Sequence, residues 1–406
     1  MDTSQRSDPL VGIVLDRRYR VDAMIATGGM SSVYRGLDLR LDRPVACKVM
    51  DSRYAGDRQF LERFQREARA VARLKDPGLV AVYDQGLDGQ HPFLVMELVE
   101  GGTLRELLRE RGPMPPHAVA AVLAPILGGL AAAHRAGLVH RDVKPENVLI
   151  SDDGEVKIAD FGLVRAVAEA KITSTSVILG TAAYLSPEQV GTGDAGPGSD
   201  VYAVGVLAYE LLTGTTPFTG DSALAVAYRR MDNDVPPPSA AIAGVPRQFD
   251  DLVARATRRR PEDRYADAAA MATALQAAVD ELGLPPFRVP APRNSAQHVA
   301  AEQYRSRVLD EDDRDTTQTT AAPPSPPLLP PRPNSTREMT RGPGDWERPA
   351  NRSVPGRFAG IEIDELEWAR QRGRRVALFW LVAIVTLTAG VAAGAWTLGS
   401  NLQGLF

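Results

Sequence analysis

A stretch of 23 residues without a charge, Val376 to Leu398, most strongly limits what this chain can form. At about 1.5 Å rise per residue, a helix of this length crosses the hydrocarbon core of a bilayer. Four arginines lie between positions 370 and 375, and no charged residue follows the stretch. Because basic residues collect on the cytoplasmic side, the sequence predicts a single-pass protein of the cell membrane. Residues 1–375 are then cytoplasmic, and residues 399–406 form a short extracellular tail.

The chain before this stretch divides by composition. Residues 1–18 form an N-terminal extension whose polar start lacks the apolar segment of a secretory signal. Residues 19–282 alternate apolar runs with glycine, proline and aspartate, first strand-like (Val45 to Met50, Phe93 to Leu98) and then mostly helical, which indicates one α+β domain. Residues 283–375 are dominated by proline, polar and charged residues, so we expect a disordered juxtamembrane linker.

Charge and cysteine content exclude several classes of function. The 47 basic residues nearly balance the 51 acidic ones, and the net charge of -4 argues against nucleic-acid binding by this chain. The single cysteine, Cys47, has no partner for an intramolecular disulfide or a zinc site. We therefore expect Cys47 to be a packing residue.

The chemically most informative residues form two motifs. His140-Arg141-Asp142-Val143-Lys144-Pro145-Glu146-Asn147 is followed, thirteen residues after its last asparagine, by Asp160-Phe161-Gly162. These motifs, in this order, resemble the catalytic loop and the metal-binding motif of protein kinases. The resemblance covers residues 19–282 and is strongest to membrane-anchored Hanks-type Ser/Thr kinases of actinobacteria, here without an extracellular sensor domain. It implies a bilobal fold with a small β-rich lobe and a larger helical lobe, and transfer of phosphate from ATP to protein substrates.

Phosphoryl transfer needs a carboxylate at the incoming hydroxyl, a cation on the transferred phosphate, and oxygen ligands for a divalent metal. By resemblance, Asp142 is the base or positions the hydroxyl, and Lys144 contacts the γ-phosphate. Asn147 and Asp160 are the implied ligands of Mg²⁺ or Mn²⁺.

Val45-Ala46-Cys47-Lys48 matches the family strand whose lysine holds the α- and β-phosphates. Glu67, in a stretch of helical periodicity, matches the glutamate that orients this lysine. Taken alone, such a pair is more often an ordinary surface ion pair. The flanking motifs favour the functional interpretation.

The glycine-rich loop departs from the family pattern. It reads Ala26-Thr27-Gly28-Gly29-Met30-Ser31, with alanine at the first glycine position. Since alanine can still adopt extended backbone angles, we expect weaker nucleotide affinity at most. The resemblance assigns further ATP-binding residues: Val33, Ala46 and Leu149 around adenine, Met96 as gatekeeper, and the backbone of Glu97 and Val99.

The segment from Asp160 to Glu188 resembles the peptide platform of the Ser/Thr-specific branch, with Thr181 near the catalytic aspartate. The resemblance implies an ion pair between Glu188 and Arg264, and assigns Asp200 to bracing the catalytic loop.

Threonines in the same segment are candidates for regulation. Arg141, beside the catalytic aspartate, is a cation suited to a phosphate group, and we expect autophosphorylation at Thr173 and Thr175. The alternative is a loop rich in Ser and Thr for solubility alone.

Other readings stay open from sequence alone. A membrane-tethered pseudokinase scaffold is favoured only by Ala26, and a small-molecule phosphotransferase is disfavoured by the complete peptide platform. Gly390 and Gly394 have a spacing that allows two membrane helices to approach, so a homodimer is possible, but chance explains this spacing equally well.

Overall fold

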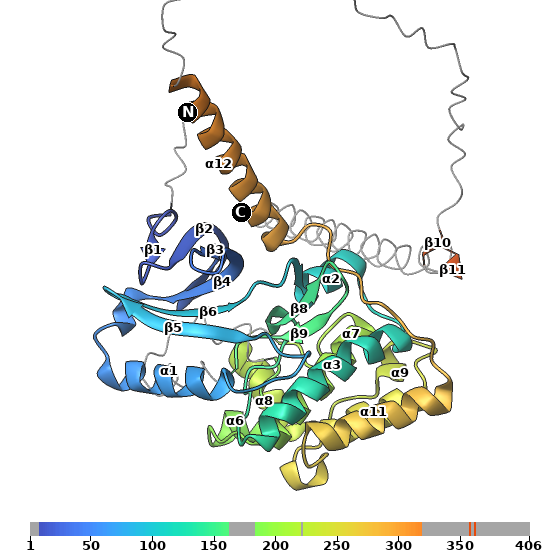
Figure 1. Ribbon diagram of the computed structural model, residues 1–406. Helices are drawn as coiled ribbons and strands as arrows, with labels where there is room; N and C mark the ends of the chain where they lie inside the picture. The colour runs from blue at the N-terminus through green and yellow to red at the C-terminus, as the bar shows by residue number, and fades with distance from the viewer. Residues whose placement is uncertain (1–7, 162–182, 221, 319–356, 359–360, 363–406) are drawn as a thin grey trace, which may run out of the picture. The chain divides into compact units, whose positions relative to one another are not determined.

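The computed structural model describes residues 8–161, 183–220, 222–318, 357–358 and 361–362 (Figure 1). Contacts within the chain divide it into two units, Met1–Pro323 and Pro324–Phe406. In the second unit, the described residues form an antiparallel pair of short strands, β10 (Arg357–Phe358) and β11 (Ile361–Glu362). The predicted membrane helix lies outside the described residues.

The first unit begins with a strand-rich lobe. Its antiparallel sheet has six strands in the order β1-β2-β3-β4-β6-β5. The strands are β1 (Val14–Leu15), β2 (Tyr19–Thr27), β3 (Ser31–Asp38), β4 (Arg43–Met50), β5 (Val82–Asp88) and β6 (His91–Glu97), with a short 3-10 helix, η1 (Ser52–Tyr54), after β4. Helix α1 (Arg58–Val71) packs against this sheet. Asp57 caps its N-terminus, and the Asp57 carboxylate accepts a hydrogen bond from the Phe60 N–H at 3.0 Å.

Strand β4 shows why the sheet forms. Successive side chains of a strand point to opposite faces, and here Val45, Cys47 and Val49 enter one apolar cluster while Ala46 and Met50 enter the other, beside α1. Cys47 is fully buried, and burial raises the pKa of its thiol to about 12. It is the packing residue that the sequence predicted.

The helical lobe follows in the sequence. It contains α2 (Leu104–Arg111), α3 (Pro116–Arg135), α6 (Pro187–Gly191), α7 (Pro197–Thr213), α8 (Ala223–Asp232), α9 (Pro238–Ala241), α10 (Arg247–Ala256), η3 (Pro261–Asp263) and α11 (Ala268–Leu282). Helices α3 and α7 contact each other and are buried over most of their lengths, so they form the core. Among the helices that the structure describes, α3 alone has the length and apolar composition of a membrane span, and most of it is buried in this lobe.

A small three-stranded sheet positions the catalytic segments. Its order is β7 (Gly101–Thr103), β8 (Val148–Ser151), β9 (Val156–Ile158). The 3-10 helix η2 (Pro145–Asn147) leads directly into β8, and Asp160 follows β9 by two residues. Pairing of β8 with β9 therefore brings the two sequence motifs side by side.

The prediction of a disordered linker from residue 283 is wrong for its first part. After α11 the chain runs in extended conformation along the domain and then forms α12 (Ala296–Gln318), which contacts β2, β3 and β7 (Figure 1). Val289 and Ala300 are buried, and the Ser295 hydroxyl donates a hydrogen bond to the Gly101 carbonyl. We name residues 285–307 the docked segment. A few apolar side chains of this segment are buried against the folded domain. The average composition of residues 283–375 does not reveal these individual contacts.

Candidate active site

Asp142 lies at the centre of the site, in the loop between α3 and η2. Its carboxylate Oδ2 accepts hydrogen bonds from Lys144 Nζ at 2.8 Å and from Asn147 Nδ2 at 3.0 Å, and the same Nδ2 donates to the Asp142 carbonyl at 2.8 Å. The other oxygen, Oδ1, is buried and has no hydrogen-bond partner. An ionised carboxylate has accepting capacity on both oxygens. Oδ1 is therefore the atom left to receive a substrate hydroxyl.

Asp200, near the start of α7, holds the backbone of this loop. Its Oδ2 accepts from the His140 N–H at 2.8 Å and from His134 Nε2 at 2.9 Å, and its Oδ1 accepts from the Arg141 N–H at 2.8 Å. Arg141 has a φ of 71°, which is unfavourable for a side chain of this size. The bonds from Asp200 hold that conformation in place, so the predicted brace is confirmed.

His140 has a structural role that the sequence motif did not reveal. Its Nδ1 accepts from the Asp142 N–H at 3.2 Å, so its protonated Nε2 donates to the Ala159 carbonyl at 2.7 Å. The ring also contacts Phe161 edge-on, with ring centroids 4.4 Å apart. His140 thus joins the catalytic loop to the residues on both sides of Asp160. The pairing of β8 with β9 contributes to bringing these partners together.

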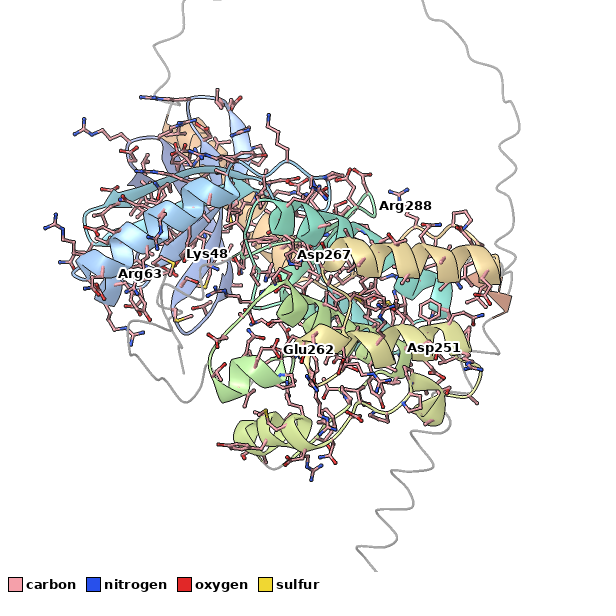
Figure 2. All side chains as sticks on the ribbon, turned by 90° about the horizontal axis from the view of Figure 1, so that it is seen from below. Lys48, Arg63, Asp251, Glu262, Asp267 and Arg288 are labelled. Carbon is pink, nitrogen blue, oxygen red and sulfur yellow. The ribbon has the colours of Figure 1, made fainter. Side chains whose placement is uncertain are left out.

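Lys48, on β4, forms an ion pair with Asp160 at 2.7 Å (Nζ to Oδ1). Burial alone would raise the pKa of Asp160, but Lys48, His140 and Lys144 lower it below its usual range. Glu67 lies on the half-buried side of α1, and no ion pair within 4.0 Å joins it to Lys48 in the described structure. The predicted pairing of Lys48 with Glu67 is therefore not present, and Asp160 takes the position of the lysine's partner. Figure 2 places Lys48 in the strand-rich lobe, away from Asp251, Glu262 and Asp267 of the helical lobe.

The residues predicted to surround adenine come together. One apolar cluster contains the buried Ala46 and Met96 and the partly buried Met30, Val33, Val99 and Leu149. The Glu97 N–H already donates to the Ala81 carbonyl at 2.9 Å, so a contact from this residue to adenine would come from its carbonyl.

Ala26 lies near the end of β2, in the hairpin of β2 and β3 that carries the predicted phosphate-binding loop. It pairs with Val33 across β2 and β3, next to an irregularity between Met24 and Ala26. The turn is closed by the Gly28 N–H, which donates to the Ser31 carbonyl at 2.8 Å. Alanine at this position leaves the hairpin intact, and Thr27 and Gly29 complete the predicted loop.

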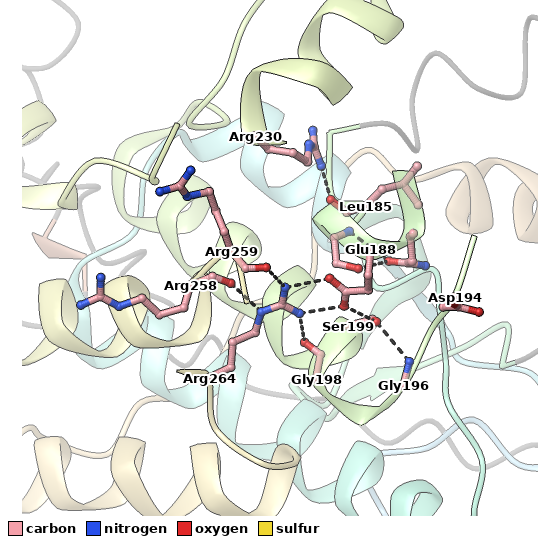
Figure 3. A network of polar contacts seen from close by, with 12 residues as sticks. Leu185, Glu188, Asp194, Gly196, Gly198, Ser199, Arg230, Arg258, Arg259 and Arg264 are labelled. Atoms are coloured by element: carbon pink, nitrogen blue, oxygen red, sulfur yellow. Dashed lines mark hydrogen bonds and ion pairs between the residues drawn. The ribbon is translucent and has the colours of Figure 1, made fainter. Parts of the chain in front are cut away.

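Glu188 and Arg264 form the predicted ion pair (Figure 3). Two nitrogens of the guanidinium donate to the two carboxylate oxygens, each at 2.8 Å, and the remaining N–H groups donate to backbone carbonyls of Gly198, Arg258 and Arg259. Burial alone would raise the pKa of Glu188, but hydrogen bonds from Arg264 and Ser199 lower it to about 2. This network fixes the end of the segment that carries the predicted peptide platform. Thr173, Thr175 and Thr181 lie outside the described residues.

Comparison with known proteins decides the family. The family model described as "Protein kinase domain" matches residues 19–276. The chain belongs to the protein kinase family.

Three kinases from mycobacteria show how far the similarity extends. The chain is 67% identical, over 98% of both sequences, to the serine/threonine-protein kinase PknL of Mycobacterium tuberculosis. It is 44% identical over 63% of its length, and 42% of the relative's, to the serine/threonine-protein kinase PknB of the same species. The crystal structure of the M. tuberculosis PknI kinase domain superimposes with a TM-score of 0.52 at 27% identity, covering 66% of this chain and 97% of that one. The protein is accordingly a serine/threonine protein kinase.

Protein kinases use ATP and a divalent metal, and the residues present fit both. Asn147 commits its Nδ2 to Asp142, which leaves its amide oxygen for a ligand, and Asp160 has a second carboxylate oxygen besides the one bound by Lys48. These hard oxygen donors suit Mg²⁺ and Mn²⁺, which usually complete their coordination with water and substrate phosphates.

Proposed function

We propose that this protein is a membrane-anchored kinase that transfers the γ-phosphate of ATP to serine or threonine residues of protein substrates at Asp142. The observation that carries this proposal is the asymmetric environment of the Asp142 carboxylate. One oxygen is held by Lys144 and Asn147, while Oδ1 is buried and unpartnered. Such a carboxylate can orient an attacking hydroxyl and accept its proton.

The neighbouring residues divide the remaining work. Lys144 places a cation beside the position of the hydroxyl, where negative charge accumulates on the transferred phosphate. Asn147 and Asp160 would hold the metal, which when bound neutralises charge on the phosphates. Lys48 on β4 would contact the α- and β-phosphates. The apolar cluster around Ala46 would bind the adenine.

We also propose that activity depends on a rearrangement of α1. Kinase activity requires the strand lysine paired with the helix glutamate while the metal-binding aspartate holds its ion. In this structure Lys48 instead contacts Asp160. Autophosphorylation at Thr173 and Thr175 is our proposed trigger, because each phosphate would bring about two negative charges, for which the cationic Arg141 is the candidate partner. Dimerisation of the membrane helix through Gly390 and Gly394 would favour phosphorylation between two copies.

The catalytic assignment is tested with the full chain in detergent, ATP and Mg²⁺ or Mn²⁺. Wild type is compared with Asp142→Asn and with the matched control Asp153→Asn, which changes a carboxylate that is 95% exposed. We expect phosphothreonine in wild type and in the control, and none above background in Asp142→Asn. Equal labelling of all three proteins would refute the role of Asp142.

Membrane anchoring and the trigger need separate tests. Deleting residues 376–398 should move the protein from the membrane to the soluble fraction of a lysate. Replacing Thr173 and Thr175 together by alanine should lower phosphorylation of an added substrate at least about tenfold. Retention in the membrane after the deletion, or full activity without both threonines, would contradict the respective proposal.

A further inference from the structure

A partly buried cluster of charges lies beside the catalytic loop. Arg105 of α2 donates from Nε to Glu146 of η2 at 2.8 Å and from Nη1 to Glu210 of α7 at 2.6 Å. Its Nη2 donates to the Tyr184 hydroxyl at 2.6 Å, and Tyr184 in turn hydrogen-bonds to Glu210. One side chain thus joins three elements of the lobe and the segment that precedes α6.

The helix that carries Arg105 is determined by its own sequence. Helix α2 begins with a reciprocal cap, in which the Thr103 hydroxyl accepts from the Glu106 N–H and the Glu106 carboxylate accepts from the Thr103 N–H. Leu104, Leu107 and Leu108 are buried against the core, which turns Arg105 toward η2 and α7. Its guanidinium is therefore held in position by its own helix.

The cluster contains one cation and two carboxylates. Glu210 is nearly buried, with 5% of its side chain exposed, whereas 45% of the Glu146 side chain is exposed. The acidic cluster therefore opens to solvent at Glu146. Burial would lower the pKa of Arg105, but Glu210, Tyr184 and Glu146 raise it above its ordinary value. Three hydrogen bonds thus hold the charged Arg105 guanidinium between Glu146, Glu210 and Tyr184.

The exposed end of the cluster, Glu146, lies four residues after Asp142 in the chain. Glu146 lies between Lys144 and Asn147, the two residues that hold the Asp142 carboxylate. An extended peptide spans about 3.3–3.6 Å per residue, so a side chain two or three residues from the phosphorylated serine or threonine comes within reach of Glu146. Two carboxylates at such a place would attract a basic side chain of a substrate.

We propose that Arg105 fills this acidic site from within the chain, so that the kinase does not select arginine or lysine at that position of its substrates. This inference rests on the protein kinase activity proposed above. The internal guanidinium makes the hydrogen bonds that a substrate arginine would make, and it is already in place. Removing it converts an occupied site into one that binds a basic residue.

The experiment compares two peptides that differ only at one position near the phosphoacceptor, arginine or alanine, scanned over three residues on each side. The full chain in detergent is assayed as wild type, Arg105→Ala, Arg105→Ala with Glu146→Gln, and Glu146→Gln alone. The measured quantity is the ratio of kcat/KM for the arginine and alanine peptides, which a general loss of stability does not change. Phosphorylation of the alanine peptide is measured first, since its absence in wild type contradicts the kinase activity and not this inference.

We expect a ratio near one in wild type and in Glu146→Gln, and a ratio of at least about fivefold in favour of arginine in Arg105→Ala, as for a partly exposed ion pair. The double variant should lose this preference. A preference for arginine already in wild type that Glu146→Gln removes would overturn the proposal, as would an active Arg105→Ala without any gain. Because Arg105→Ala leaves Glu210 buried without its cation, Arg105→Ala with Glu210→Gln serves as the second test variant. It should still show a preference for arginine over wild type, through the remaining charge of Glu146.

Discussion

The pair of Glu188 and Arg264 allows a quantitative test of what holds the substrate platform. Replacing Glu188 by glutamine keeps the shape of the side chain and removes its charge. The pKa of Glu188 falls from 4.5 to about 2 in the folded protein, which corresponds to about 3 kcal/mol of stabilisation. Because 18% of the side chain is exposed and solvent screens part of the interaction, we expect Glu188→Gln to lower the free energy of unfolding by about 2 kcal/mol at pH 7.

The pH dependence of this loss has a definite sign. A carboxylate whose pKa is lowered on folding stabilises the protein above its unfolded pKa of 4.5, and that contribution disappears as the pH falls toward 2. The difference between wild type and Glu188→Gln should therefore be constant from pH 7 to about pH 5 and shrink below pH 4.5.

Denaturant unfolding at pH 7 and at pH 3.5 measures both quantities. The matched control is Glu262→Gln, which removes an exposed carboxylate two residues from Arg264, and it should leave the unfolding midpoint unchanged. A difference below 0.5 kcal/mol at pH 7, or one that does not shrink at pH 3.5, would refute the assignment of this stabilisation to the charge of Glu188.

Three further predictions concern the site and its surroundings. Asp200→Asn weakens the charge-assisted hydrogen bonds that hold the catalytic loop, which are worth about 1.5–3 kcal/mol each. It should lower kcat at saturating ATP at least about tenfold. An unchanged kcat would show that the loop does not need Asp200. Ala26→Gly should change the KM for ATP less than about threefold, because Ala26 already fits the hairpin, and a larger improvement would show that alanine impairs binding. A fragment ending at Leu284 should melt at least about 4 °C below one ending at Gln318, because it loses the buried Val289 and Ala300. Equal melting temperatures would mean that the docked segment contributes nothing to stability.

The sequence predicted well what depends on local pattern. An apolar run predicted the strand Val45 to Met50 within β4, and burial of both its faces explains why it lies inside the sheet. Proline content predicted disorder after residue 282 and was wrong up to residue 318. Prolines occur both between 323 and 333 and at 285, 286, 290 and 292 in the docked segment, so proline content alone does not tell a docked stretch from a disordered one. Its contacts, such as Arg307 with the Asp22 carbonyl at 2.6 Å, join residues far apart in the sequence.

The polar network of the site shows more clearly what sequence patterns alone do not predict. His140 and Asp200 are 60 residues apart, and Glu188 and Arg264 are 76 residues apart. No periodicity or charge pattern links such residues, so these pairs were predicted only through resemblance to a family. Resemblance failed for Lys48, because one ammonium group can pair with Asp160 or with the helix glutamate and the sequence is the same in both cases. Under the rearrangement of α1 proposed above, the choice between these partners would depend on a conformational equilibrium and not on any sequence motif.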